Sequence, residues 1–135
     1  MTQTIHIKVR GYHLDVYGHV NNARYLEFLE EGRWAFFDTR MDLARLMEKE
    51  ISFVVVNINI NFKRPAFLGH LLAIDTTISK INHRSGVIHQ VIRLEGTDTV
   101  VADADVTFVL YDNKAGAAAP LKGEILDFLR PLMTP

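Results

Sequence analysis

Cysteine is absent from the 135 residues, which excludes disulfides, thiolate metal ligands and cysteine nucleophiles, and nothing indicates secretion. An excess of charge is also lacking, because 15 Lys and Arg stand against 16 Asp and Glu. No apolar run approaches the roughly 18 residues of a membrane span, and the first ten residues lack the pattern of a signal peptide. We therefore expect a cytoplasmic protein that binds neither nucleic acid nor membranes.

What is present is an ordinary globular composition, with 48% hydrophobic and 23% charged residues. The sequence has no internal repeat, no low-complexity segment and no linker-like stretch. The length is close to the commonest size of one domain. We expect residues 1–135 to form one domain.

Hydrophobic periodicity predicts the secondary structure. Spacings of three and four predict a long amphipathic helix over 23–39, with Asn21 or Asn22 as its N-cap. The other predicted elements are strands at 4–10, 52–62, 71–81, 87–94 and 100–111, a short helix at 43–50 and a short C-terminal helix within 121–133.

The order of these elements is typical of an α+β fold, in which one helix covers one face of an antiparallel sheet. We expect the last four strands to form a meander, because short turn-rich connections separate several of them. In the strand 52–62, alternation assigns Val54, Val56, Ile58, Ile60 and Phe62 to one face. Apolar residues on both faces of this strand and of 87–94 suggest that a second subunit covers the other face, so we expect at least a homodimer.

Gly32 lies inside the predicted long helix, where glycine costs about 1 kcal/mol relative to alanine. We interpret it as a point where another backbone packs closely against the helix.

The segment from Asp15 to Tyr25 concentrates an acid, a histidine, two asparagines and a glycine just before the long helix. Unpaired N–H groups and a partial positive charge at a helix N-terminus polarise a carbonyl and stabilise an oxyanion. Asp15 is placed to attack such a carbonyl or to activate water. Taken alone, however, an acid such as Asp15 is more often a turn or cap residue and a histidine such as His19 is more often structural, and both asparagines are most simply helix caps.

Two segments carry a resemblance to a known family. The run HLDVYGHVNNARYLEFLEE at 13–31 resembles the signature of the 4-hydroxybenzoyl-CoA thioesterase family of hotdog-fold proteins. The run FVVVNININFKRPA at 53–66 is similar to a strand of bacterial long-chain acyl-CoA thioesterases linked to fatty-acid degradation. The resemblance implies a five-stranded antiparallel sheet wrapped around one long central helix, followed by a short C-terminal helix.

The same resemblance implies hydrolysis of an acyl-CoA thioester, with a fatty chain of medium to long length and without a cofactor or metal. Asp15 matches the family's acidic residue, which acts as a nucleophile or as a general base for water. The backbone N–H near Asn22 matches the oxyanion donor, Gly18 and His19 shape the loop, and Tyr25 matches the tyrosine after the asparagine pair.

Coenzyme A carries phosphates, so basic residues are expected at the rim of its site. The candidates are Lys63 and Arg64 at a strand end and Arg84, Ser85 and Gly86 in a hairpin, although turns often carry such charges on their surface. Candidate linings of the acyl groove are Tyr25, Leu29, Trp34, Phe36 and Phe53, although residues of this kind are more often part of an ordinary core.

Two other readings stay open at this stage. A hotdog acyl-thioester hydratase or dehydratase would use Asp15 and His19 to move protons, and a non-catalytic acyl-CoA-binding protein would use the same groove without turnover. The resemblance also implies an active site at a subunit interface of a homodimer that assembles to a homotetramer. Scattered histidines without a ligand spacing argue against a metal site.

Overall fold

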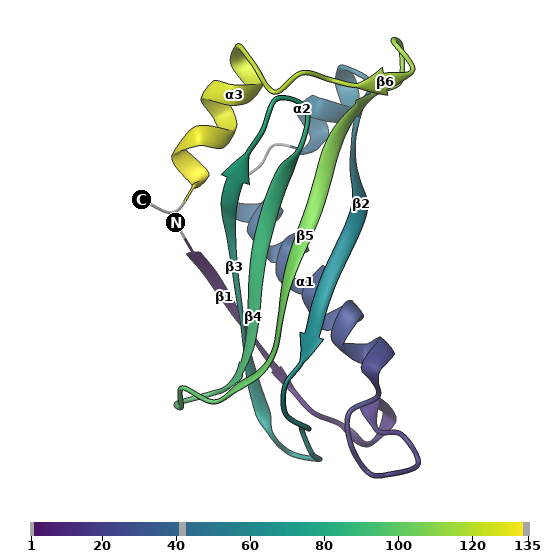
Figure 1. Ribbon diagram of the computed structural model, residues 1–135, viewed down its shortest axis with the longest axis vertical. Coiled ribbons are helices and arrows are strands. Elements are labelled where there is room, and N and C mark those ends of the chain that lie inside the picture. Colours follow the sequence, from purple (N-terminus) through teal and green to yellow (C-terminus); the bar gives the residue numbers. More distant parts are fainter. Residues whose placement is uncertain (1, 41–42, 134–135) are drawn as a thin grey trace.

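The computed structural model of the chain describes residues 2–40 and 43–133 (Figure 1). Each predicted strand and helix is present, within a few residues of its expected bounds. The strands are β1 (Thr2–Lys8), β2 (Ile51–Phe62), β3 (Leu71–Ile81), β4 (Gly86–Leu94), β5 (Val100–Asp112) and β6 (Ala117–Ala118). The helices are α1 (Asn22–Arg40), α2 (Leu43–Glu48) and α3 (Glu124–Leu129), with 3₁₀ turns at Gly11–His13 and Arg130–Leu132.

The sheet is antiparallel, and its strand order is β1-β3-β4-β5-β2. The five long strands confirm the predicted sheet, and the two-residue β6 adds a sixth strand beside β5. The predicted four-strand meander is wrong, because β2 pairs with β5 and not with the β3 strand that follows it in sequence. Only β3, β4 and β5 form a meander, and the 63–70 connection carries the chain from the β2 edge to β3, next to the β1 edge.

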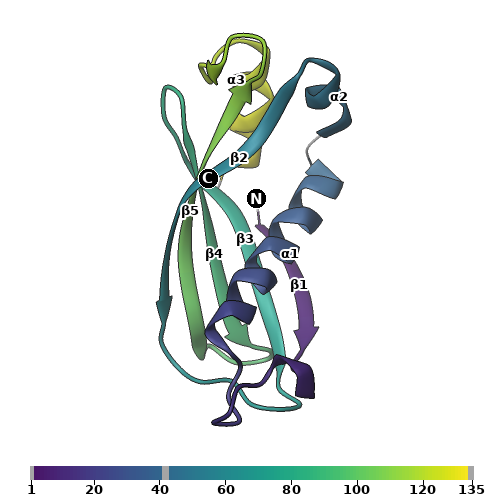
Figure 2. The same cartoon turned by 90° about the vertical axis from the view of Figure 1, so that its right-hand side faces the viewer.

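Helix α1 lies along one face of the sheet, where the core forms (Figure 2). Its residues Leu29 and Phe36 are completely buried, as are Ile74, Ile88 and Phe108 on the facing strands. A Cβ atom on Gly32 would lie 2.9 Å from side-chain atoms of both Ile74 and Thr76 and 3.0 Å from the amide nitrogen of Gln90. The close approach expected at Gly32 is therefore present, but its neighbours are sheet side chains and not another backbone.

A β-bulge in β2 changes which side chains face the helix. Val55 pairs with Phe108 and Asn57 pairs with Thr107, so Val56 is the extra residue. The predicted assignment of Val54 and Val56 to the face of Ile58 is therefore wrong, and both valines are exposed. Phe53 and Val55 share the inner face with Ile58 and Ile60 instead, because the bulge reverses the alternation.

The sheet face away from α1 carries paired charges. Arg93 contacts Asp75 at 2.9 Å, His89 contacts Asp105 at 2.9 Å and Lys63 contacts Asp103 at 3.0 Å. Exposed large apolar side chains also occur on β2, at Val54 and Val56, and on α1, at Leu26 and Trp34, and the most exposed ones, Val16 and Tyr17, lie in the loop before α1.

The long strands separate two ends of the molecule (Figure 1). The lower end carries the 9–21 loop and the 63–70 connection, which contact each other through the Val20 N–H to Ala66 carbonyl hydrogen bond of 2.9 Å. The upper end carries α2, α3, β6 and the turn between β3 and β4. Among the residues that the structure describes, no helix is long and apolar enough to cross a membrane.

Candidate active site

A pocket at the lower end brings together most of the predicted catalytic residues. It has a volume of about 210 Å³, and it lies where the 9–21 loop and the start of α1 meet the end of β2. Its lining consists of Asp15, His19, Val20, Asn22, Tyr25, Phe62, Lys63, Arg64 and Pro65.

Asp15 opens a tight turn that fixes its carboxylate. The Asp15 N–H donates to the His19 carbonyl at 2.8 Å, and the Gly18 N–H donates back to the Asp15 carbonyl at 3.0 Å. Gly18 has a φ of 77°, a left-handed conformation that glycine adopts without strain and that completes this three-residue hairpin. The Asp15 Oδ1 atom accepts hydrogen bonds from the N–H groups of Tyr17 at 2.9 Å and His19 at 3.3 Å. Rigid backbone donors thus hold the half-buried carboxylate at the pocket.

The N-terminus of α1 presents an unused donor to the same pocket. The Asn21 side chain caps the helix, because its Oδ1 accepts the Ala23 N–H at 2.9 Å. The Asn22 N–H donates to no group in the described part of the chain, so it keeps its hydrogen-bonding capacity and the partial positive charge of the helix end. A carbonyl oxygen or an anion in the pocket is the partner that such a group accepts.

Tyr25 lies one turn further along α1. Its hydroxyl is the one buried side-chain polar atom without a hydrogen-bond partner among the described residues. Burial raises the pKa of Tyr25 and the Asp15 charge adds to this effect, whereas the Ala66 backbone beside the hydroxyl opposes it, and the net direction is upward. The protonated hydroxyl is therefore favoured and can donate a hydrogen bond. The ring lies 5.6 Å from that of Phe62, which orients it against the end of β2.

His19 has a more structural environment than Asp15. Its ring meets Phe67 edge to face, with 5.0 Å between ring centroids, and its carbonyl accepts the Asp15 N–H. The neighbouring His13 is buried, and its Nδ1 accepts the Arg10 N–H at 2.9 Å while its carbonyl accepts the Asn21 N–H. Burial lowers the pKa of His13, which favours the neutral ring that this contact requires. His13 therefore ties both ends of the loop, a role that the sequence did not reveal.

The two basic residues at the end of β2 differ in their contacts. The Lys63 Nζ atom forms an ion pair with Asp103 on the open face of the sheet. Within residues 2–40 and 43–133, the exposed Arg64 guanidinium has neither an ion pair nor a hydrogen bond, and its side chain lines the pocket. Arg64 is the cation at this pocket best placed to meet a phosphate group.

Three further predicted residues do not join the pocket. Arg84, Ser85 and Gly86 lie at the upper end, and the length of β3, about 33 Å, separates them from Asp15 in the same chain. The Arg84 side chain donates to the Ala118 carbonyl at 2.7 Å. Gly86 is buried, and a Cβ atom there would lie 2.4 Å from the Phe108 ring, so packing explains its glycine.

A second pocket follows the flank of α1 beside β2. It has a volume of about 330 Å³ and is lined by Glu30, Arg33, Trp34, Phe37, Leu43, Phe53 and Val55. Of the predicted acyl-groove residues, Trp34 and Phe53 line this flank pocket and Tyr25 lines the first, whereas Leu29 and Phe36 are core residues.

Sequence reasoning missed Phe62 and Arg33 as lining residues. Phe62 was assigned only to a strand, because local alternation does not show that this strand ends beside the Asp15 loop. Arg33 is 7% exposed, and its Nη1 donates to the Gln90 Oε1 at 3.1 Å. Burial lowers its pKa, and the Glu30 charge opposes this effect. Arg33 is therefore a covered charge on an amphipathic helix.

Comparisons with known proteins agree with this architecture. The family model of the thioesterase-like superfamily matches residues 9–129. The long-chain acyl-CoA thioesterase FadM of Escherichia coli is 52% identical over 127 residues, which cover 94% of this chain and 96% of that protein. A chloroplastic acyl-acyl carrier protein thioesterase, ATL2 of Arabidopsis thaliana, is 30% identical over 82% of this chain and 59% of its own length.

Solved structures give the same result. The probable thioesterase YbaW of Escherichia coli has a TM-score of 0.91 and 50% identity, with 97% of this chain and 98% of that chain covered. A 1,4-dihydroxy-2-naphthoyl-CoA thioesterase from Synechocystis has a TM-score of 0.84 at 20% identity over the whole of both chains, a likeness of fold alone. The family resemblance and the predicted fold are confirmed. The chain belongs to the thioesterase-like superfamily and is a thioesterase of hotdog fold.

Proposed function

We propose that the protein hydrolyses medium- to long-chain fatty acyl-CoA to the free acid and coenzyme A. The observation that carries this proposal is the pocket in which the anchored Asp15 carboxylate, the free Asn22 N–H and the unpaired Tyr25 hydroxyl converge. The 52% identity to the long-chain acyl-CoA thioesterase of Escherichia coli supports the substrate class.

In the proposed reaction, the thioester carbonyl oxygen accepts a hydrogen bond from the Asn22 N–H. Asp15 then either attacks the carbonyl carbon, giving an anhydride that water opens, or removes a proton from the attacking water. Both routes break the carbon–sulfur bond, transfer the acyl group to water and leave the proton on the sulfur of coenzyme A. The Asn22 donor stabilises the negative charge that develops on the oxygen.

Tyr25 supplies the second donor in this scheme. Its hydroxyl lies beside the Ala66 backbone but has no acceptor among the described residues, and a buried O–H that donates to nothing is unfavourable unless a bound group accepts its hydrogen bond. We assign this bond to the thioester or to the attacking water. His19 supports the Asp15 turn, and Gly18 permits it.

The flank pocket is the proposed site of the acyl chain. Asn22 and Trp34 are separated by about 18 Å along the axis of α1, and aromatic and aliphatic side chains of α1 and β2 border the path. A path of this length suits a medium or long chain better than a short acyl group. Arg64, and to a smaller extent the ion-paired Lys63, are the proposed contacts of the coenzyme A phosphates on this chain.

A homodimer would extend this site. Strand β2 is an edge strand, paired with β5 on one side only, and its free edge carries the exposed Val54 and Val56. Antiparallel pairing of two β2 edges across a two-fold axis would bring the upper end of one protomer toward the lower end of its partner. Arg84 and Ser85, which are remote from Asp15 in their own chain, could then serve the partner's site. The homotetramer and the cytoplasmic location stay predictions from the sequence.

The test is the release of free thiol from acyl-CoA of increasing chain length, together with a benzoyl-CoA, by the wild type and by Asp15→Asn. We expect wild-type turnover to be greatest with medium or long chains, and Asp15→Asn to lose at least 100-fold in kcat while it still binds substrate. Asp38→Asn, at an exposed carboxylate near the far end of α1, is the matched control and should keep wild-type activity. A product with water added to the chain and the thioester intact would indicate a hydratase instead.

A further inference from the structure

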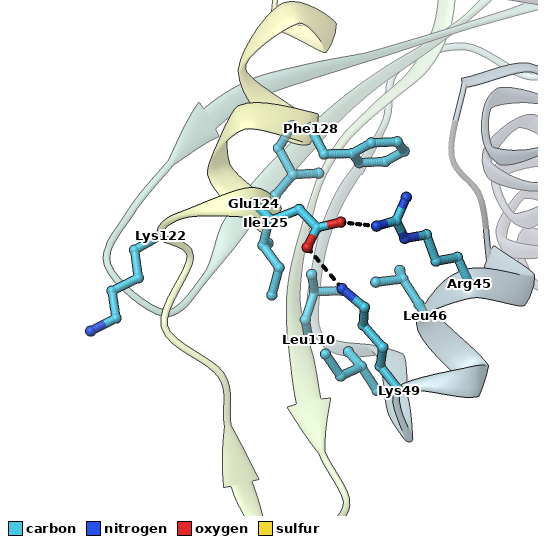
Figure 3. A pocket seen from close by; sticks show the side chains of 10 residues that line it. Arg45, Leu46, Lys49, Leu110, Lys122, Glu124, Ile125 and Phe128 are labelled. Carbon is cyan, nitrogen blue, oxygen red and sulfur yellow. Dashed lines mark hydrogen bonds and ion pairs between the residues drawn. The ribbon is translucent and has the colours of Figure 1, made fainter.

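A third pocket lies at the upper end, between α2 and α3 (Figure 3). We call it the α2–α3 pocket. Its volume is about 380 Å³, which falls in the range of roughly 300–1,000 Å³ that is usual for small-molecule sites. The length of the sheet separates it from Asp15, and it shares no lining residue with the pockets described above.

The interior of the α2–α3 pocket is apolar. Leu110 and Leu129 are buried at its base, and Leu46, Ile51, Ile125 and Phe128 complete its walls. Phe128 keeps 37% of its surface exposed, a high value for a phenylalanine. A hydrocarbon chain that entered the pocket would cover this surface and gain hydrophobic stabilisation.

Cations gather at the mouth of the pocket around one carboxylate. Glu124 accepts a hydrogen bond from Arg45 on one carboxylate oxygen, and its other oxygen lies 2.9 Å from the Lys49 Nζ atom (Figure 3). The hydrogen bond from Lys49 and the charges of Arg45 and Lys49 lower the pKa of Glu124. The mouth therefore presents two positive charges in a geometry that fits a carboxylate, whereas the Lys122 side chain is directed away from this cluster (Figure 3).

The Glu124 carboxylate is held only weakly between Arg45 and Lys49. Its side chain is 60% exposed, and those of Arg45 and Lys49 are 61% and 46% exposed. Exposed ion pairs of this kind contribute little to stability, because water and salt screen them. Glu124 also stands at the first position of the six-residue α3, so its side chain can turn outward without unfolding the helix.

We propose that the α2–α3 pocket binds the anion of a free fatty acid. The hydrocarbon chain lies against the apolar wall, and the ligand carboxylate takes the place of the Glu124 carboxylate between Arg45 and Lys49. A fatty acid is also the product that the proposed reaction would release, so the choice of this ligand rests on the proposed function. The pocket itself is independent of Asp15.

The test uses decanoate below its micelle concentration and isoleucine methyl NMR spectra of the protein. Ile51 and Ile125 line the α2–α3 pocket, whereas Ile60 lies on β2 close to Phe62 and reports on the proposed acyl path. We expect decanoate to shift the methyl signals of Ile51 and Ile125. Lys49→Met should weaken this binding at least fivefold, and Glu124→Gln, which removes the competing carboxylate, should strengthen it at least threefold.

Two comparisons complete the test. Decanol, which has the same chain without the charge, should bind equally to the wild type and to both variants. Thiol release at low substrate concentration should be the same in Lys49→Met as in the wild type, which shows that the variant is folded and separates this proposal from the proposed function. Shifts at Ile60 alone, or decanoate binding that neither variant changes, would overturn the proposal.

Discussion

Two carboxylates mark the opposite ends of this molecule, and they are held in different ways. Backbone N–H groups of a tight turn fix Asp15, whereas the long side chains of Arg45 and Lys49 hold Glu124 at an exposed surface. The turn holds its carboxylate through the backbone, whereas the exposed cationic pair is the proposed binding place of a ligand carboxylate. The comparison separates the group proposed to act in catalysis from the group proposed to be exchanged, and four substitutions probe how firmly polar groups are held across the molecule.

The largest effect is expected from lengthening the fixed carboxylate. Asp15→Glu keeps the charge but moves it by one methylene away from the Tyr17 and His19 donors, and a displacement of about 1 Å can reduce turnover about 100-fold. The measurement is kcat for thiol release at saturating acyl-CoA, with Asp38→Glu as the control. Full activity of Asp15→Glu would show that the backbone anchoring does not matter.

The second prediction concerns the buried polar cluster around Gln90, which lies between the two ends of the molecule. Gln90 accepts from Arg33 and donates to the Leu29 carbonyl at 2.8 Å and to the Thr76 Oγ1 atom at 2.9 Å. Gln90→Leu removes these three hydrogen bonds, including that of the buried Arg33 guanidinium, and should lower the free energy of unfolding by about 2 kcal/mol. Urea denaturation measures the change, and Thr76→Val, which removes a single acceptor, should show a smaller loss. An unchanged midpoint would mean that water replaces the amide.

A half-buried ion pair gives an intermediate effect. Burial alone would raise the pKa of Asp75, but hydrogen bonds from Arg93 and Thr4 outweigh it and the pKa is lowered. The stabilisation is therefore complete above the unfolded pKa near 4 and is lost as the pH falls through the folded pKa. Asp75→Asn should reduce stability by about 1 kcal/mol at pH 7. Denaturation at pH 3 should show a smaller difference, and an equal loss at both pH values would contradict the assignment.

The smallest effect is expected at the exchangeable carboxylate. Glu124→Gln should leave the Tm unchanged at 150 mM salt, because the ion pairs that it removes are exposed and screened. Thiol release should also be unchanged at low substrate concentration. A fall in Tm comparable with that of Asp75→Asn would mean that Glu124 holds α3 in place and is not free to move aside.

The positions of the helices and strands followed from local patterns in the sequence, whereas the residues of the candidate site were assigned from the family resemblance of segment 13–31. Periodicity located α1 to within one residue at each end, and the Asp15 loop was identified by its turn residues. The order of strands did not follow, because the pairing of β2 with β5 joins segments far apart in sequence. The bulge at Val56 was also missed, since three consecutive valines carry no alternation that would fix their faces.

The site residues that the sequence did not predict correctly also depend on contacts between segments far apart in the chain. Lys63 and Arg84 are both basic residues next to strand ends. Lys63 lies beside Asp15, whereas Arg84 lies at the far end of the sheet. Gly86 resembles a loop glycine that donates its N–H, yet the Phe108 ring requires it. Only the three-dimensional neighbours distinguish these cases, and a single chain sequence does not display them.

The absence of a side chain at Gly32 also determines where a substrate can go. Because α1 lies so close to Ile74, Thr76 and Gln90, the space between helix and sheet is already filled at the middle of the helix. The acyl chain of the proposed substrate would therefore pass beside α1, along the β2 edge. In the proposed homodimer the partner would add a wall there, so changes at the proposed subunit contact should alter chain-length preference without any change at Asp15.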